Sequence, residues 1–341
     1  MRRSLVLVFS LAISSIAPAN AIMGGTDATG DPRVVALIPW TENFQRGCSG
    51  ALISPRIVLT AAHCLSRMPK SGIWRPDSNT ELPVSGPLSP KTPLWVASPG
   101  IIIPTVGTSN KVKVIAQYGS PLYQDAACDS KTKSCHGSRY DFGVLVLEKP
   151  LGQQKYRIAT SAEVRNLISS GTEASALGYG LTSYEESLGT PRDQNPNFAK
   201  VQVRSQFVWQ GGDELVEPYF ENMIVQTRWP LNVYGGGGDS GSPLWAKING
   251  EDVYVGALSA ATGATAATKP GDPLFTDVFW GTNGKAGPGG QYFTAQAFQS
   301  VIDEATNFLK VQIEVEQKAA ADAKAAADAK AAADAKAAAD A

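Results

Sequence analysis

A serine lies between glycines in the segment GGGDSGSP, residues 236–243. Glycines on both sides of a residue allow a sharp turn and let a ligand approach the backbone closely. A nucleophilic serine needs this freedom, together with nearby backbone N–H groups that can stabilise a developing oxyanion. The pattern therefore indicates nucleophilic catalysis, with Ser240 as the candidate nucleophile.

A serine hydroxyl becomes nucleophilic only beside a base, and a third group, usually a buried carboxylate, must orient that base. The chain has two histidines, and His63 lies in TAAHC at residues 60–64. Asp141 begins the apolar run DFGVLVL at residues 141–147. His63 and Asp141 are therefore the candidate base and orienting acid, and we assign His136 no role.

The motifs TAAHC, DFGVLVL and GDSGSP, in the order His, Asp, Ser, resemble the chymotrypsin/trypsin family of serine proteases. That order differs from the order in subtilisins and α/β-hydrolases. The resemblance implies that Ser240 attacks the scissile carbonyl, that His63 transfers the proton and that Asp141 orients His63. It also implies an oxyanion hole made by the N–H groups of Gly238 and Ser240. The expected function is a secreted bacterial serine endopeptidase, and the alternative is an inactive, protease-like binding or adhesion module.

The first 21 residues are typical of a secretory signal peptide. Arg2 and Arg3 precede an apolar run from Leu5 to Ile16, and small residues occupy the −3 and −1 positions of a cleavage site, Ala19 and Ala21. We therefore expect a secreted or periplasmic protein. No other stretch has the ~18 continuous apolar residues that a membrane-spanning helix needs.

The segment after this signal, Ile22-Met23-Gly24-Gly25, resembles the start of mature enzymes in the family. In those enzymes a propeptide is usually cut after a basic residue, and the freed amine pairs with the aspartate before the nucleophile. Here that activation pair is Ile22 and Asp239, and residue 21 is alanine. Our hypothesis is that signal peptidase makes the activating cut; the alternative is a cut elsewhere followed by a second protease.

Short runs rich in β-branched residues, bounded by Gly, Pro, Asn or Ser, predict strands at 34–38, 56–59, 111–115, 176–180 and 253–258. Apolar residues at helical spacing predict a helix near residues 298–309. Together with the family resemblance, which covers residues 22 to about 309, these elements predict an all-β fold. We expect two six-stranded antiparallel β-barrels with a C-terminal helix, in a protease domain spanning residues 22–310 with a Pro-rich surface insertion at about 66–125.

The four cysteines allow three pairings. The family resemblance implies a disulfide between Cys48 and Cys64, which braces the histidine. With that pair taken, Cys128 and Cys135 are left to pair, in a bridge without a family counterpart. We expect no metal site and no cofactor.

The predicted specificity pocket departs from the trypsin pattern. Tyr234 stands where trypsin-like members carry aspartate, and Ser259 would pair with the substrate backbone. Ala261 would narrow the entrance, and Phe275 would close the back of the pocket. These residues favour a small or apolar side chain at the cut site.

Residues 318–341 repeat KAAADA four times. Alanine has the highest helix propensity, and a six-residue period places no continuous apolar stripe on one face, so residues 311–341 are expected to form a solvated helical tail. It is either a low-complexity extension or an attachment to a surface or partner. The net charge, −1 for the whole chain, indicates no nucleic-acid partner, and the expected partner is a protein or peptide substrate.

Overall fold

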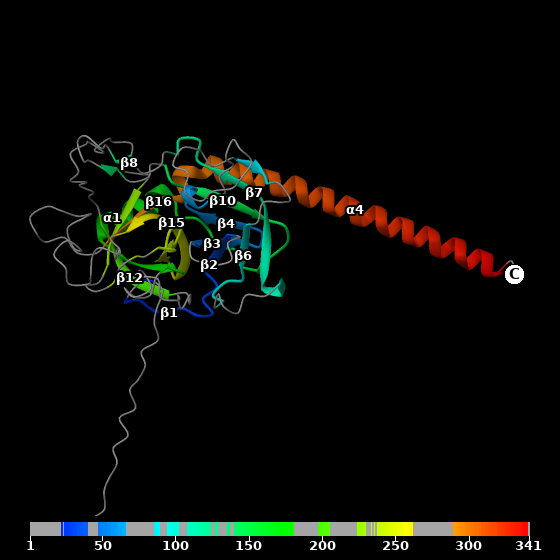
Figure 1. The fold of residues 1–341 in the computed structure, drawn as a ribbon, viewed down its shortest axis with the longest axis horizontal. Coiled ribbons are helices and arrows are strands. Elements are labelled where there is room, and N and C mark those ends of the chain that lie inside the picture. Colours follow the sequence, from blue (N-terminus) through cyan, green and yellow to red (C-terminus); the bar gives the residue numbers. More distant parts are fainter. Residues whose placement is uncertain are drawn as a thin grey trace, which may run out of the picture.

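The computed structural model describes residues 22, 24–39, 47–65, 85–88, 94–101, 108–123, 127–128, 135–136, 140–180, 197–204, 224–229, 233, 235, 237–261 and 289–339. These residues form antiparallel sheets followed by one long helix, α4 (Figure 1). The fold is therefore mostly β with a C-terminal helix, as the sequence predicts.

The C-terminal half contains a closed six-stranded barrel. Its strands pair in the order β12-β11-β14-β15-β16-β13, and β13 pairs again with β12. The short strand β1 (Thr26–Asp27) extends β12 on its outer side. The barrel strands are β11 (Glu173–Gly178), β12 (Asn197–Arg204), β13 (Ile224–Arg228), β14 (Pro243–Ile248), β15 (Glu251–Ala261) and β16 (Gly289–Thr294).

A second antiparallel sheet comes from the N-terminal half. Its strands pair in the order β10-β4-β3-β2-β6-β7, β7 also pairs with β10, and β5 (Gly86–Pro87) extends β7. A separate ladder joins β8 (Ala127–Cys128) to β9 (Cys135–His136). The strands of the main sheet are β2 (Val35–Pro39), β3 (Cys48–Ser54), β4 (Ile57–Thr60), β6 (Leu94–Ala97), β7 (Lys111–Gly119) and β10 (Gly143–Leu147).

Both faces of this N-terminal sheet are apolar because each covers a different core. In β10, Leu145 and Leu147 join one buried cluster, whereas Val144 and Val146 join another. Successive side chains of a strand point to opposite faces, so the two sets alternate. The second cluster also holds Trp245 and residues of α4, so it packs the sheet against the rest of the molecule.

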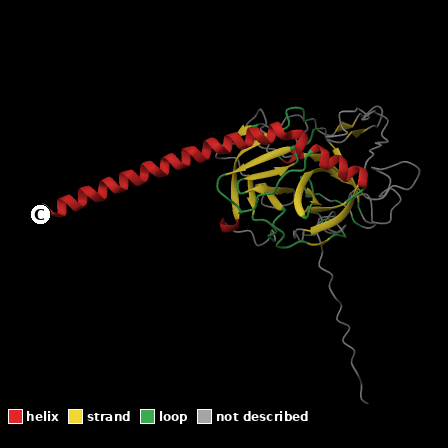
Figure 2. Cartoon of the chain, turned by 180° about the vertical axis from the view of Figure 1, so that it is seen from behind, coloured by secondary structure: helices red, strands yellow, loops and turns green. Residues whose placement is uncertain are grey.

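Helix α4 (Gln299–Ala339) follows a 3-10 turn, Ala295–Phe298, and its first turns pack on the strands. Phe298 stacks on Phe142 with ring centroids 5.0 Å apart, and Phe308 lies against Tyr118. After Glu316, which pairs with Arg56, every described residue of the helix is exposed, and the helix runs outward into solvent, as Figure 2 shows from behind. The helix continues through residue 310 without a break, because the segment from there to the repeats contains no glycine or proline.

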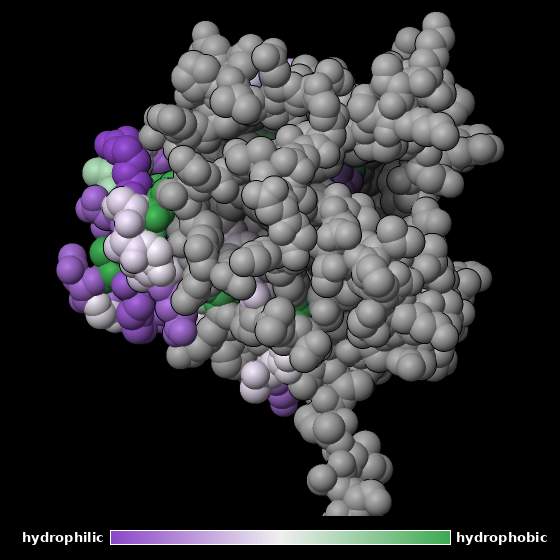
Figure 3. Space-filling view, turned by 90° about the vertical axis from the view of Figure 1, so that its left-hand side faces the viewer, coloured by the Kyte–Doolittle hydropathy of each residue, from purple (hydrophilic) through white to green (hydrophobic). Residues whose placement is uncertain are grey.

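A shorter helix, α1 (Ser161–Ser170), precedes β11 and has defined ends. Thr160 and Glu163 form a capping box, in which the Thr160 hydroxyl accepts from the Glu163 amide and the Glu163 carboxylate accepts from the Thr160 amide. Gly171 ends the helix in the left-handed conformation that glycine adopts easily. Among the described residues on the face seen in Figure 3, hydrophilic side chains predominate at the surface.

The predicted strand runs are confirmed as β2, β4, β7, β11 and β15. The insertion expected within residues 66–125 cannot include β6 and β7, because both are integral strands of the N-terminal sheet. Residues 66–84 and 89–93 of that range lie outside the described residues.

Candidate active site

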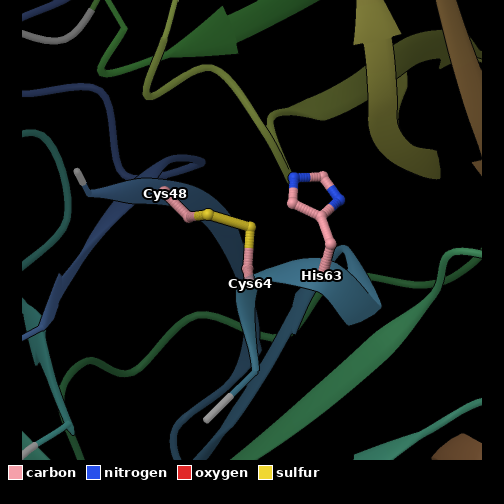
Figure 4. A group of neighbouring side chains, drawn as sticks. All are labelled: Cys48, His63 and Cys64. Atoms are coloured by element: carbon pink, nitrogen blue, oxygen red, sulfur yellow. A yellow bond between two sulfur atoms is a disulfide. The ribbon is translucent and has the colours of Figure 1, made fainter. Parts of the chain in front are cut away.

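His63 lies on a 3-10 turn, Ala62–Cys64, directly after strand β4. The disulfide between Cys48, on β3, and Cys64 ties this turn to the neighbouring strand, as predicted. Figure 4 shows the imidazole ring standing beside that bridge. The ring is held close to the sheet, yet about a quarter of the side chain, 24%, stays accessible.

Asp141 binds His63 through both of its oxygens. One oxygen, Oδ2, lies 2.6 Å from the Nδ1 atom of the His63 ring, and the other, Oδ1, accepts the His63 backbone N–H at 2.9 Å. The carboxylate therefore fixes both the position of the turn and the orientation of the ring. The structure thus joins two of the three predicted catalytic residues, His63 and Asp141, by two direct hydrogen bonds.

A third hydrogen bond reaches Asp141 from Ser259, whose hydroxyl donates to Oδ2 at 2.7 Å. Asp141 is fully buried, and burial alone would raise its pKa. The charge of His63 and the hydrogen bonds from His63 and Ser259 outweigh burial, so the pKa of Asp141 is lowered. The sequence predicts that Ser259 pairs with the substrate backbone. It gives no sign that Ser259 also supports the Asp141 carboxylate.

Ser240 lies in a tight loop between β13 and β14. Two glycines of the loop have positive φ, Gly238 at 106° and Gly241 at 77°, which side chains rarely permit. A Cβ at Gly241 would meet the Thr60 hydroxyl and come within 3.0 Å of the Ala61 amide. The residue after Ser240 thus touches the two residues that lead into the turn of His63.

Backbone bonds hold this loop at both ends. The Gly241 amide donates to the Leu258 carbonyl at 2.7 Å, and the Leu258 amide donates to Ser242 at 2.8 Å. On the other side, the Ser49 amide donates to the Ser240 carbonyl at 2.8 Å. The loop is therefore fixed to β15 of the barrel and to β3 of the N-terminal sheet at once. Nothing in the sequence points to Ser49 for this role.

Asp239, the predicted partner of a free amine at Ile22, is buried, and its Oδ1 accepts the Gly180 amide at 2.8 Å. Gly178 and Gly180 lie against its carboxylate so closely that neither position has room for a Cβ. The Ile22 side chain is also fully buried, within the core of the C-terminal barrel. Ile22 has φ 55°, a conformation that strains a β-branched residue.

Comparison with known proteins gives two kinds of match. The family model described as trypsin matches residues 22–86, beginning at Ile22. A trypsin-like protease of Streptomyces glaucescens is 28% identical over 272 residues, 79% of this chain and 85% of the relative. A trypsin of Saccharopolyspora erythraea is 28% identical over 257 residues, 73% of this chain and 91% of the relative.

The chain is thus similar to bacterial trypsin-like proteases. This similarity supports a peptidase, whose ligands would be proteins or peptides. In the part of the chain that the structure describes, no helix combines the length and the apolar character required to cross a membrane.

The predicted specificity pocket is described only in part. Tyr234 and Phe275 lie outside the described residues, and the backbone of Ala261 ends β15, opposite Gly290. A Cβ at Gly290 would touch Leu258, Tyr292 and Trp229 at 3.0–3.2 Å. The indole N–H of the buried Trp229 donates to the Thr227 hydroxyl at 2.8 Å. The C-terminal barrel is thus densely filled beside β16, and nothing in the sequence points to Trp229.

Three residues with metal-ligating atoms lie within 4.8 Å of one another in the described part of the chain: Cys48, His63 and Cys64 (Figure 4). The sulfur atoms of Cys48 and Cys64 are joined in the disulfide, so neither cysteine can act as a thiolate ligand of a metal ion. Cys128 and Cys135 face each other in the β8–β9 ladder, and their disulfide stays a prediction.

Proposed function

We propose that this protein is a secreted serine endopeptidase that hydrolyses peptide bonds through Ser240, His63 and Asp141. The observation that carries the proposal is the double hydrogen bond between His63 and the buried Asp141 carboxylate. A partly accessible imidazole held in this way is suited to act as a general base. The loop contacts of Gly241 with Thr60 and Ala61 support a position of Ser240 within reach of it.

In the proposed reaction, the Oγ atom of Ser240 attacks the scissile carbonyl while His63 accepts its proton. The N–H groups of Gly238 and Ser240 stabilise the oxyanion of the tetrahedral intermediate. His63 then donates the proton to the leaving amine, and an acyl-enzyme remains on Ser240. Water, deprotonated by His63, hydrolyses this ester. Asp141 keeps one imidazole tautomer and stabilises the charged ring throughout.

The proposed architecture is the chymotrypsin-like pair of barrels within residues 22–310. The closed pairing of β12 with β13 and the pairing of β7 with β10 support two barrels. The catalytic residues would then come from both halves: His63 and Asp141 from the first, and Ser240 from the second. Residues 1–21 would be the signal peptide, and 311–341 the tail.

Activation is proposed to coincide with export. Cleavage between Ala21 and Ile22 frees an ammonium group, and the buried carboxylate of Asp239 is a group of opposite charge that can pair with it. Cleavage also removes the strain at Ile22, because a terminal residue has no preceding carbonyl to crowd its side chain. The enzyme would then need no separate zymogen step.

A fluorophosphonate probe tests the proposal, because only an activated serine reacts with it. We expect wild-type protein to be labelled at Ser240, with no labelling of Ser240→Ala and at least ~10³-fold slower labelling of His63→Ala. An unlabelled, folded wild-type protein starting at Ile22 would favour the inactive binding module instead. Cleavage of a peptide library then tests the preference for small or apolar residues at the cut site.

A further inference from the structure

We propose that Ser49 is a positioning residue that fixes the proposed oxyanion loop relative to the catalytic histidine. The proposal rests on the proposed protease function and adds a residue to it. Ser49 lies on β3, next to Cys48, and its side chain is fully buried. It does not touch the reacting atoms in this assignment; it acts through the backbone of residues 238–240.

Ser49 holds the loop through two polar groups, its side-chain hydroxyl and its backbone amide. The Tyr179 amide donates to the Ser49 hydroxyl at 2.8 Å, and the hydroxyl lies 2.9 Å from the Gly238 carbonyl oxygen. Because an amide can only donate and a carbonyl can only accept, the hydroxyl hydrogen must point to Gly238. The Ser49 amide donates to the Ser240 carbonyl at 2.8 Å.

These two bonds fix the carbonyl groups of Gly238 and Ser240, the two residues whose N–H groups would form the oxyanion hole. Peptide planes are rigid, so fixing a carbonyl limits rotation of the backbone on either side of it. Glycine rotates more freely than other residues, and Gly238, at φ 106°, has no side chain of its own to restrain it. The Ser49 hydroxyl supplies that restraint from a neighbouring strand.

The same stretch of β3 also holds the histidine. Cys48 is bonded to Cys64, the residue after His63, and the Ser49 carbonyl accepts the Thr60 hydroxyl at 2.8 Å. One dipeptide, Cys48-Ser49, therefore connects to the turn that carries the base and to the loop that carries the nucleophile. We infer that this dipeptide sets the distance between base, nucleophile and oxyanion donors.

The experiment compares Ser49→Ala with a matched variant, Ser120→Ala. Ser120→Ala removes another buried serine hydroxyl, which accepts the Leu122 amide at 3.3 Å, and leaves the bonds to Gly238 and Ser240 in place. Turnover is measured on the best peptide amide that a library gives for the wild type. For Ser49→Ala we expect kcat to fall about 10- to 100-fold with KM changed less than about 2-fold, because oxyanion contacts form only in the transition state.

A peptide boronate of the same sequence gives a second readout, since its adduct with Ser240 places an oxygen in the oxyanion position. Its affinity should fall in Ser49→Ala by about the same factor as kcat, should stay near the wild-type value in Ser120→Ala and should be largely restored in Ser49→Thr. If Ser49→Ala does not fold, Ser49→Cys, a weaker donor of similar shape, is measured in its place, after mass analysis shows that Cys48–Cys64 still forms.

The outcomes separate this proposal from the proposed function. A wild-type protein without turnover or probe labelling would end both. An active wild type with an unchanged kcat in Ser49→Ala would overturn the role of Ser49 alone. So would equal losses in Ser49→Ala and Ser120→Ala, or a change confined to KM, because each would indicate a general loosening of the core.

Discussion

Asp141 is bonded to His63 twice, once through the ring Nδ1 at 2.6 Å and once through the backbone N–H at 2.9 Å. The first bond selects the tautomer of the imidazole, and the second holds the turn on which the ring stands. A single buried carboxylate therefore determines both where the base lies and which nitrogen carries its hydrogen. This relationship gives the most direct test of the catalytic assignment.

Replacing Asp141 with asparagine should keep the shape of the site and remove the preference for the active tautomer. We expect kcat to fall by about 10⁴-fold, as such a change does in a Ser-His-Asp triad. Steady-state turnover on the best library peptide measures the effect, and circular dichroism checks the fold. A loss of less than about 10-fold in a folded variant would mean that Asp141 does not orient the base.

Ser259→Ala should change the acid stability of the protein. The Ser259 hydroxyl helps to lower the pKa of Asp141 in the folded state. A carboxyl with a lowered folded pKa stabilises the fold above its unfolded pKa, and that contribution is lost as the pH falls through the folded pKa. Without the hydroxyl the folded pKa rises, so the contribution of Asp141 is smaller and its loss should be complete at a higher pH.

Acid unfolding followed by circular dichroism measures this shift. At neutral pH we expect Ser259→Ala to lose about 1–2 kcal/mol of the free energy of unfolding, because one bond to an ionised group is gone. Ser169→Ala is the control, since its hydroxyl bonds only a carbonyl of its own exposed helix turn. Equal acid midpoints for the wild type and Ser259→Ala would contradict the role assigned to this bond.

Gly241→Ala and Gly250→Ala form a matched pair, because both glycines have positive φ, at 77° and 84°. A Cβ at Gly250 meets nothing within 4 Å, so that variant should lose only about 1–2 kcal/mol from backbone strain. At Gly241 the Cβ would collide with Thr60 and with the Ser49 carbonyl, which displaces the loop of Ser240.

We therefore expect Gly250→Ala to keep near wild-type turnover, and Gly241→Ala to lose at least about 100-fold in kcat, as a shift of about 1 Å in a catalytic group can do. Thermal unfolding reports the strain in both variants. Similar turnover in the two variants would show that the packing of Gly241 does not position the nucleophile.

Part of the candidate site was predictable from sequence because its residues stand in local motifs. TAAHC and the apolar run after Asp141, which forms β10 as expected, point to the two residues that the structure joins by hydrogen bonds, and the role of Ser240 in GDSGSP stays a prediction. The support from Ser259 and Ser49 was not predictable, because it depends on contacts between segments 118 and 189 residues apart in the chain. Nothing in the sequence around a serine says which distant strand its hydroxyl will face.

The C-terminal helix differs from its prediction. Its amphipathic start and its alanine-rich repeats have different patterns, which predict two separate elements. The structure has a single helix, α4, because helix propensity stays high across the junction. The spacing of apolar residues shows which face of a helix is buried. This spacing changes where the helix leaves the sheet, although the helical backbone continues unchanged.

The N-terminus of the exported protein tests the activation proposal. We expect sequencing of the secreted protein to begin at Ile22 and the protein to be active without further processing. Asp239→Asn should then lose at least about 100-fold in kcat, because the ammonium group would lack its buried counter-charge. A start at any other residue, with full activity, would contradict the proposal that export and activation are one cut.

The position of α4 depends on an ion pair near its exit from the sheet. Both terminal nitrogens of Arg56 bond the Glu316 carboxylate, at 2.8 and 3.0 Å, and Arg56 also donates to the Leu147 carbonyl. The Arg56 side chain is buried, whereas the Glu316 side chain is 53% exposed, so water partly replaces the lost partner. Glu316→Ala should therefore lower the free energy of unfolding by about 1 kcal/mol, and Glu314→Ala, two residues away on the exposed side, should lower it by less than about 0.5 kcal/mol.

Removal of residues 319–341 should leave this ion pair and the packing of Phe308 intact. We expect the truncated protein to unfold at the same denaturant concentration as the full chain and to keep its turnover, because every described residue of that segment is exposed. Far-ultraviolet circular dichroism should lose the helical signal of the repeats and no more. A lower unfolding midpoint or a lower kcat after truncation would show that the repeats contact the protease domain in solution.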